Sequence, residues 1–254
     1  MKTIKLNELT AESVSRHGVV CVPSETPPTP DVLLDIAVRV GKPVPFGLGK
    51  YQSSELPREI TLLDNLGDGV TSAPKSFGEG WHQDSSFLPS APEFTMLTAL
   101  DVPSVGGDTL FADTRAGFEG LSELEIADLM LISLTHTVGP TYRIVPKDIG
   151  KSVQELCDEL PRAIHPLVIK HSVAGQTLLL SPLYTSLNLS ANIKPTIDRL
   201  LETILRKSFA HHWSKGDIVV WDNRVVLHSA PGYAGNQRRR LMRIVIEAEA
   251  RLES

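Results

Sequence analysis

The sequence predicts a mainly β fold with flanking helices, in the form of a barrel or jelly roll. From about residue 94 onward, short apolar runs alternate with Gly, Pro and Asp turns, which is typical of such folds. Helical patterns occur at the start of the chain and as insertions between the strands, so we expect helices to brace the outside of the barrel. We expect residues 1–254 to form one domain, because barrels of this size are often single domains.

Three parts follow one another along the chain. A helical N-terminal part covers about residues 1–42, with helices at Leu6–His17, ended by Gly18, and from Asp31 to Gly41. Turn residues crowd about residues 43–80, and loops of this length usually bind ligands or act as lids. The jelly-roll core follows at about 81–248, with strands at Phe94–Leu100, Thr109–Ala112, Ala163–Lys170, Gln176–Leu180, Asp217–Trp221, Val225–His228 and Leu241–Glu247 and helical insertions at about Arg115–Leu131 and Lys194–Phe209.

Composition and charge exclude several classes of protein. The 25 basic and 30 acidic residues give a net charge of −5, and no basic cluster is long enough to indicate nucleic-acid binding. No run approaches the ~18 apolar residues of a membrane span, and the first residues lack the apolar core of a signal peptide. Two cysteines are too few for a secreted disulfide framework, so we expect a protein of the reducing cytoplasm.

Two segments supply candidate metal ligands. On a strand, His82 and Asp84 would point to the same face, because residues two apart do so. The segment Gly216–His228 looks like two strands around a tight turn, ending in a histidine. Taken alone, neither segment requires a metal. Ordinary packing explains His82 and Asp84 better, and a hairpin with a packed histidine explains the second segment better. Together, two histidines and one carboxylate with open positions are the set that suits non-haem Fe(II), whereas structural zinc takes four protein ligands.

The run Arg238–Ile246 is a third candidate, because it combines arginines with a strand that is apolar on both faces. By the two-residue period, Arg239 and Arg243 share one face. A buried arginine costs several kcal/mol unless it is paired, so these two guanidinium groups would point inward at anions. If the strand returns as a hairpin, Arg239 lies near His228. The alternative is an arginine-rich strand end at the surface.

The order and spacing of five motifs resemble a known family. The motifs are Trp81–Asp84, Gly106–Asp113, His165–Pro166, Trp221–His228 and the arginine-rich run Arg238–Ile246. Together they resemble the taurine dioxygenase-like (TauD/TfdA) family of Fe(II)/2-oxoglutarate-dependent oxygenases, over about two thirds of the chain. The resemblance implies a double-stranded β-helix (jelly-roll) core with helices packed outside.

The resemblance also implies roles for individual residues. The residues that match the family's iron ligands are His82, Asp84 and His228. Thr109 and Arg239 match the threonine and the arginine that bind 2-oxoglutarate, and Arg243 matches an arginine that binds the substrate's anionic group. Tyr184 lies, in a looser match, where the family has an aromatic substrate contact. Since no histidine lies between His17 and His82, where the taurine enzyme has one, taurine is not the expected substrate.

The implied activity is that of an Fe(II)- and 2-oxoglutarate-dependent dioxygenase. With 2-oxoglutarate and O₂ as co-substrates, it would hydroxylate a C–H bond of a small anionic molecule and release succinate and CO₂. Like many family enzymes, it would be a homo-oligomer, a dimer or a tetramer. One alternative is a jelly-roll metalloenzyme of the hydrolase or isomerase type, which leaves Thr109 and Arg239 unexplained. Another is a non-catalytic 2-oxoglutarate-binding module, against which the complete triad and both arginines argue.

Overall fold

The structure is a computed structural model that describes residues 1–46, 53–67, 72–73, 78–138, 150, 152, 155, 159–185, 189–232 and 237–247. The strands are β1 (Lys2–Thr3), β2 (Val19–Val22), β3 (Lys42–Val44), β4 (Ile60–Asp64), β5 (Ser72–Ala73), β6 (Phe94–Asp101), β7 (Thr109–Asp113), β8 (Ser133–Thr137), β9 (Arg162–Pro166), β10 (Val168–His171), β11 (Gly175–Leu178), β12 (Phe209–His211), β13 (Ile218–Asp222), β14 (Val226–Ser229) and β15 (Arg240–Glu247). The helices are η1 (Leu6–Glu8), α1 (Ala11–His17), α2 (Pro30–Ala37), η2 (Thr114–Phe118), α3 (Glu123–Leu129), α5 (Pro182–Thr185) and α6 (Lys194–Leu205).

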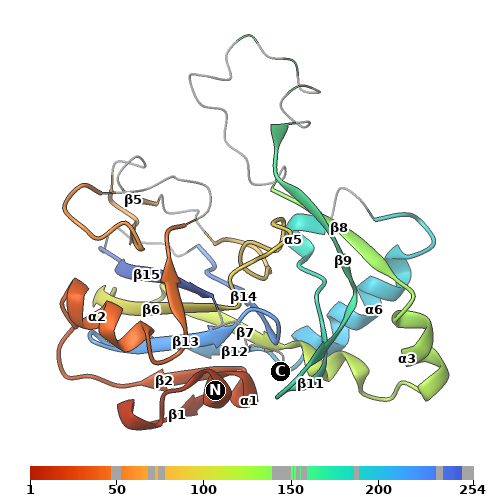
Figure 1. Cartoon of the computed structure of the whole chain (residues 1–254), viewed down its shortest axis with the longest axis horizontal. Coiled ribbons are helices and arrows are strands. Elements are labelled where there is room, and N and C mark those ends of the chain that lie inside the picture. Colours follow the sequence, from red (N-terminus) through yellow and green to blue (C-terminus); the bar gives the residue numbers. More distant parts are fainter. Residues whose placement is uncertain are drawn as a thin grey trace, which may run out of the picture.

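Two β-sheets face each other at the centre of the molecule (Figure 1). The main sheet has the order β1-β2-β13-β6-β15-β4-β5, with β3 paired to β15, and the smaller sheet has the order β12-β7-β14. Consecutive strands change sheets: β6 leads to β7, and β13 leads to β14 and then β15. This alternation is that of a double-stranded β-helix, so the predicted mainly β fold with a jelly-roll core and flanking helices is confirmed.

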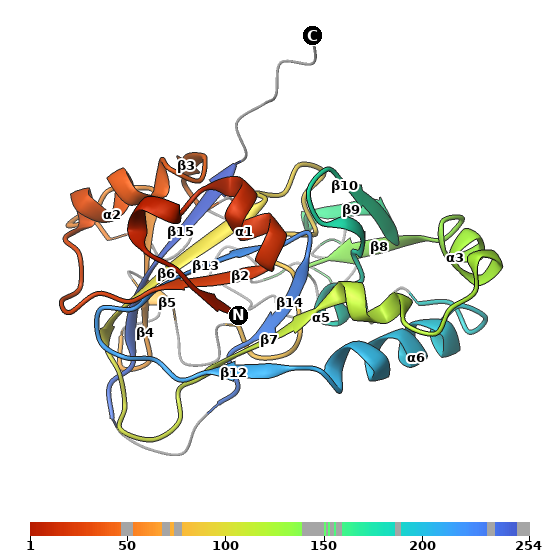
Figure 2. The same cartoon turned by 90° about the horizontal axis from the view of Figure 1, so that it is seen from below.

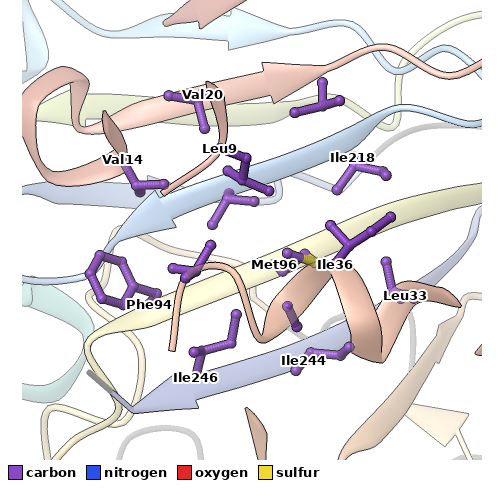
Figure 3. Close-up of a cluster of buried hydrophobic side chains, with 14 of the residues drawn as sticks. Leu9, Val14, Val20, Leu33, Ile36, Phe94, Met96, Ile218, Ile244 and Ile246 are labelled. Atoms are coloured by element: carbon purple, nitrogen blue, oxygen red, sulfur yellow. The ribbon is translucent and has the colours of Figure 1, made fainter. Parts of the chain in front are cut away.

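Helices cover the outer faces of the two sheets. Figure 2 shows α1 and α2 on one side of the main sheet and the strands β7, β12 and β14 on its other side. Apolar side chains of α1 and α2, among them Val14, Leu33 and Ile36, pack on main-sheet residues such as Met96 and Ile244 (Figure 3). On the far side, α6 packs against η2 and the smaller sheet. The inner faces of the two sheets, which no helix covers, supply the side chains of the candidate site.

The central strands alternate between these two environments. On β13, Ile218 and Val220 face the helices, whereas Val219 and Trp221 face the smaller sheet. The same period places Ile244 of β15 toward the helices and Arg243 toward the interior between the sheets, where it is 3% exposed. The prediction that this strand is buried on both faces is therefore confirmed.

Replacing Ile244 by valine is expected to lower the free energy of unfolding by about 0.5–1.5 kcal/mol, because one buried methylene is lost and the cavity closes only partly. Urea denaturation would measure this change. Val38→Ala is the control, since the Val38 side chain is 59% exposed and its truncation should change the free energy by less than about 0.5 kcal/mol. Equal effects of the two substitutions would contradict the core assignment.

Several predicted elements are divided or supplemented in the structure. The helix predicted at Leu6–His17 is split into η1 and α1, because Thr10 caps α1 and accepts a hydrogen bond from the Ser13 N–H. Its predicted end is confirmed: Gly18 adopts φ +73° at the C-cap. The N-terminal part is not only helical, since β2 pairs with β13 in the main sheet. The predicted lid loops at 43–80 fall partly outside the described residues.

Two expected hairpins are wrong. Strands β13 and β14 do not pair with each other: β13 pairs with β2 and β6, and β14 pairs with β7. Strand β15 likewise pairs with β3, β4 and β6 rather than with β14. The turn between β13 and β14 therefore carries the chain from one sheet to the other. His228 and Arg239 consequently approach the interior from opposite sheets.

Candidate metal centre

The first motif is tied to the third strand of the smaller sheet. His82 forms an isolated backbone bridge with His228 of β14, with N–O distances of 3.0 Å and 2.9 Å in the two directions. The expectation that His82 and Asp84 share a regular strand is wrong, because Asp84 already lies in a turn, and Ser85 follows it with φ 55°. The turn nevertheless directs the Asp84 carboxylate back toward both imidazoles.

The three predicted ligands converge in a buried cluster. The distance from His82 Nε2 to Asp84 Oδ1 is 3.6 Å, and that from His228 Nε2 to Asp84 Oδ2 is 3.7 Å. All three side chains are less than 10% exposed. With metal–ligand bonds of ~2.1 Å, neighbouring ligands of a six-coordinate ion lie about 3 Å apart. The spacing thus fits a divalent cation after a small inward shift.

Both histidines are prepared to act as ligands. The His82 Nδ1 lies 2.8 Å from the carbonyl oxygen of Gly80, so that an N–H there donates to this carbonyl and Nε2 remains for a metal. Burial, reinforced by the neighbouring His82, lowers the pKa of His228 to about 3. A neutral imidazole is the form that binds metals.

The Asp84 carboxylate is held by groups that the sequence analysis missed. Its Oδ2 accepts a 2.7 Å hydrogen bond from the Thr95 hydroxyl, and its backbone N–H donates to Asn223 Oδ1 at 3.2 Å. Asn223 Nδ2 in turn donates to Thr95 Oγ1 at 2.9 Å. Burial alone would raise the pKa of Asp84, but Arg243 and the two histidines hold it well below its usual range. The carboxylate is therefore ionised.

Gln83, between the two ligands of this turn, ties the turn to other parts of the chain. Its buried side-chain amide donates to the carbonyl oxygens of Leu178 and Asn223, both at 3.0 Å. Its Oε1 accepts from the N–H groups of Leu180 and Ser181, both at 3.1 Å. Four hydrogen bonds thus join the motif to two distant segments, which a sequence motif alone does not reveal.

A second predicted pair lies beside the triad. Arg239 Nη2 donates to Thr109 Oγ1 at 3.3 Å, and Arg239 Nε donates to the Gly107 carbonyl at 2.7 Å. The register of β7 places Phe111 opposite His228, and Thr109 lies two residues away on the same face. Gly107 adopts φ +75°, and a Cβ there would lie 2.7 Å from Pro103. The glycine is thus needed to present its carbonyl to Arg239.

The two predicted substrate residues both lie against the metal ligands. Arg243 Nη2 forms an ion pair with Asp84 Oδ2 at 2.9 Å, and its guanidinium lies 4.9 Å from the centre of the Phe46 ring. Tyr184 is 9% exposed, and its ring contacts His82 edge to face at 5.7 Å. Phe87 also packs edge to face on Tyr184, with ring centres 5.0 Å apart. Phe46, from the segment before β4, also lines the site beside Arg243, and the sequence analysis did not predict it.

The buried His136 of β8, close to this turn, provides a test by pH. Its Nδ1 lies 2.9 Å from Ser86 Oγ, and burial, with a smaller effect of His165, lowers the pKa of His136 to about 3. Below pH ~6.5 the unfolded chain binds a proton that the folded protein does not, so the free energy of unfolding decreases as the pH falls toward 3. This histidine should account for about 2 kcal/mol of that loss between pH 7 and pH 5.

We therefore expect His136→Asn to reduce the loss of stability between pH 7 and pH 5, as measured by urea denaturation at both pH values. His17→Asn is the control, because it makes the same substitution at a histidine whose side chain is exposed. An unaltered pH dependence in His136→Asn would show that His136 does not carry the effect.

Comparison with known families matches residues 4–245 to the model described as "Taurine catabolism dioxygenase TauD, TfdA family". The chain belongs to this family. The TauD/TfdA assignment agrees with the motifs and with the His82, Asp84 and His228 cluster described above.

Curated relatives of this TauD/TfdA chain include enzymes named for two kinds of substrate. An alkylsulfatase from Acinetobacter baylyi is 29% identical over 182 residues, covering 66% of this chain and 56% of that protein. A 2,4-dichlorophenoxyacetate dioxygenase, dependent on α-ketoglutarate, from Cupriavidus pinatubonensis is 31% identical over 169 residues, covering 64% and 58%. The chain thus spans little more than half the length of these curated relatives.

Solved structures share the TauD/TfdA fold. The crystal structure of AAD-2 in complex with Mn(II) and N-oxalylglycine has a TM-score of 0.76 at 23% identity and covers 97% of this chain and 92% of that one. A taurine dioxygenase from Burkholderia xenovorans has a TM-score of 0.71 at 19% identity, covering 97% and 84%. The match to a family described as dioxygenases does not favour the hydrolase, isomerase and non-catalytic alternatives. Within the described residues, no helix has the length and apolar character needed to cross a bilayer.

Proposed function

We propose that this chain is an Fe(II)- and 2-oxoglutarate-dependent dioxygenase that hydroxylates a C–H bond of a small anionic substrate, releasing succinate and CO₂. The convergence of His82, Asp84 and His228 beside the pair Thr109 and Arg239 carries the proposal. The names of the curated relatives, among them α-ketoglutarate-dependent dioxygenases, support the same reaction class.

The triad residues are suited to hold Fe(II) on one side only. Two imidazoles and one carboxylate would occupy one face of the ion and leave the opposite positions open. Bound iron, together with 2-oxoglutarate and O₂, supplies the oxidising chemistry. The chain's own contribution is to hold these ligands through Gly80, Thr95 and Asn223 and to exclude water from a buried site.

Thr109 and Arg239 are placed to bind the far carboxylate of 2-oxoglutarate. Thr109 lies two residues along β7 from Phe111, which is paired with the ligand His228, and two residues of a strand span roughly 7 Å. This distance is close to the length of an extended five-carbon diacid with C–C bonds of about 1.5 Å. One end of the co-substrate could therefore reach the metal while the other meets the guanidinium. Arg239 supplies a planar donor group of the kind that binds carboxylates bidentately, and Thr109 adds a hydroxyl.

Arg243 supports an anionic prime substrate. Its buried guanidinium contacts Asp84 and lies over the Phe46 ring. The sulfate or carboxylate group of a substrate would therefore bind to this cation next to an aromatic side chain. The relatives named for alkylsulfate and phenoxy acid chemistry fit this charge. Tyr184 would form the opposite aromatic wall. We propose small organic sulfates and aryloxy carboxylates as the first substrates to assay.

An anaerobic titration tests the proposal directly. Fe(II) is added to the metal-free protein and 2-oxoglutarate follows, while the visible metal-to-ligand charge-transfer band of the chelate is recorded. We expect the band in the wild-type protein and in the control His17→Ala, and its loss in His82→Ala. Folded wild-type protein that binds iron without developing the band would contradict the proposal. Formation of succinate that depends on both 2-oxoglutarate and O₂ would then complete the assignment.

We further propose that residues 1–254 act as one domain, in the cytoplasm, and as a dimer or tetramer. The buried free thiol of Cys21 is compatible with a reducing compartment. Large apolar side chains on and after α3 and on β9, namely Leu124, Leu131 and Ile164, are each more than 70% exposed and would be covered by association. Light scattering across a concentration series measures the state, and a monomer throughout would contradict the proposed oligomer.

A further inference from the structure

A second cluster of metal-binding side chains lies outside the centre described above. Cys21 of β2, His211 of β12 and Asp217, directly before β13, have donor atoms that all lie within 4.8 Å of one another. The three residues are only 4%, 5% and 7% exposed. Cys21 is paired in register with Val219, two residues after Asp217, so the main sheet supplies two of the donors and the smaller sheet supplies the third.

The His211 ring shows that the cluster is incompletely satisfied. Its Nε2 is buried and lies 3.2 Å from Asp217 Oδ2, but it makes no hydrogen bond in the described part of the chain. Buried ring nitrogens normally have a hydrogen-bond partner, and one without a partner calls for an explanation such as a missing ion. A ring nitrogen beside a carboxylate and a sulfur is an arrangement that a cation would stabilise.

We infer that Cys21, His211 and Asp217 form a second metal site, selective for Zn²⁺ or another thiophilic divalent cation. A tetrahedral zinc ion with bonds of ~2.0–2.3 Å keeps its ligand atoms about 3.4–3.6 Å apart, so shifts of roughly 1 Å would close the cluster. The sulfur distinguishes it from the first centre, whose donors are only nitrogen and oxygen, because thiolates favour Zn²⁺ over Fe²⁺.

The surroundings hold two of the three ligands firmly. Asp217 Oδ2 accepts a hydrogen bond from the Ser214 N–H at 2.9 Å, and the Asp217 carbonyl accepts from the Ala99 N–H at 3.1 Å. The Trp213 ring packs edge to face on His211 at 4.5 Å. Burial, with a smaller effect of Asp217, raises the pKa of Cys21 to about 12, so the thiol keeps its proton until a metal displaces it.

One residue, Trp213, connects this cluster with the proposed co-substrate pocket. Trp213, which packs on His211, donates from Nε1 to Thr109 Oγ1 at 3.0 Å. A cation that draws His211 toward Cys21 would therefore alter the environment of the Trp213 indole.

Anaerobic titration of the metal-free, full-length protein with Co²⁺ tests this inference, because a thiolate bound to Co²⁺ gives a strong near-ultraviolet charge-transfer band and the first centre has no sulfur. We expect the band in wild-type protein, its persistence in His82→Ala and Cys157→Ser, and its loss in Cys21→Ser. Adding Zn²⁺ should bleach the band, because Zn²⁺ displaces Co²⁺ from the thiolate. His211→Gln should weaken Zn²⁺ binding by more than the 10- to 100-fold that contacts around the ligands contribute.

The results of this titration either support or overturn the second metal site. Wild-type protein that is folded by circular dichroism and gives no thiolate band overturns the inference, whatever the variants do. A band that survives Cys21→Ser, or that disappears with Cys157→Ser, also overturns it, because the sulfur then lies elsewhere. A band that is lost in Cys21→Ser and weakened in His211→Gln, while His82→Ala retains it, supports a site independent of the first centre.

Discussion

Arg239→Ala is expected to raise the dissociation constant for 2-oxoglutarate by about 30- to 5,000-fold. The loss of one partner of a buried, hydrogen-bonded charge pair costs about 2–5 kcal/mol, and each 1.4 kcal/mol corresponds to a factor of ten. Among the described residues, Arg239 is the only arginine whose guanidinium the structure shows hydrogen-bonded to Thr109. The charge-transfer band of the Fe(II) complex, titrated with 2-oxoglutarate, measures the constant.

Arg238→Ala is the matched control for this prediction. Arg238 is the preceding residue and carries the same charge, but its side chain is 49% exposed and pairs with Asp64 of β4 instead of facing Thr109. We expect its 2-oxoglutarate affinity to stay within about threefold of wild type, which is less than 1 kcal/mol. Equal losses in the two variants would mean that the effect is general electrostatics rather than recognition by Arg239.

Asp84→Ala is expected to have two separate effects. It removes a ligand, so Fe(II) affinity should fall by at least about 100-fold and turnover with it, since even contacts around a metal ligand contribute 10- to 100-fold. It also takes the carboxylate away from the buried guanidinium of Arg243, 2.9 Å distant. Breaking a buried ion pair costs about 3–5 kcal/mol, so the metal-free variant should unfold at lower urea concentration than the wild type.

The double variant Asp84→Ala/Arg243→Met separates these effects. Removing both members of the ion pair leaves no buried charge of this pair behind, so we expect most of the stability of the metal-free protein to return, while Fe(II) affinity stays low. If the single variant were as stable as the wild type, or the double variant as unstable as the single, the ion pair between Asp84 and Arg243 would not be the cause.

Local patterns predicted the parts of the fold and site that depend on neighbouring residues. The two-residue period placed Arg243 toward the interior, and the motif spacing identified His82, Asp84 and His228, which the structure brings together. The hairpins failed because a tight turn specifies only that the chain reverses. It does not specify whether the next strand pairs with the previous one or crosses to a facing sheet, as β14 does.

The supporting contacts could not be predicted for a related reason. Thr95 and Asn223 reach Asp84 from segments that are 11 and 139 residues away, and neither residue type stands out in a strand or a turn. Cys21 and His211 are further apart still, and only the facing of two sheets brings them together. Such contacts depend on strand order, which these local patterns do not encode.

The backbone bridge between His82 and His228 sets a limit on biosynthesis. The two residues are separated by 146 positions in the sequence. At synthesis rates of about 5–20 residues per second, the ribosome needs roughly 7–30 s to pass from one to the other. During that interval the first histidine and its neighbouring carboxylate have no second imidazole with which to share a metal. Loading of the centre therefore waits until the strand that carries His228 has been made and docked, and a growing chain cannot retain a metal ion through this triad.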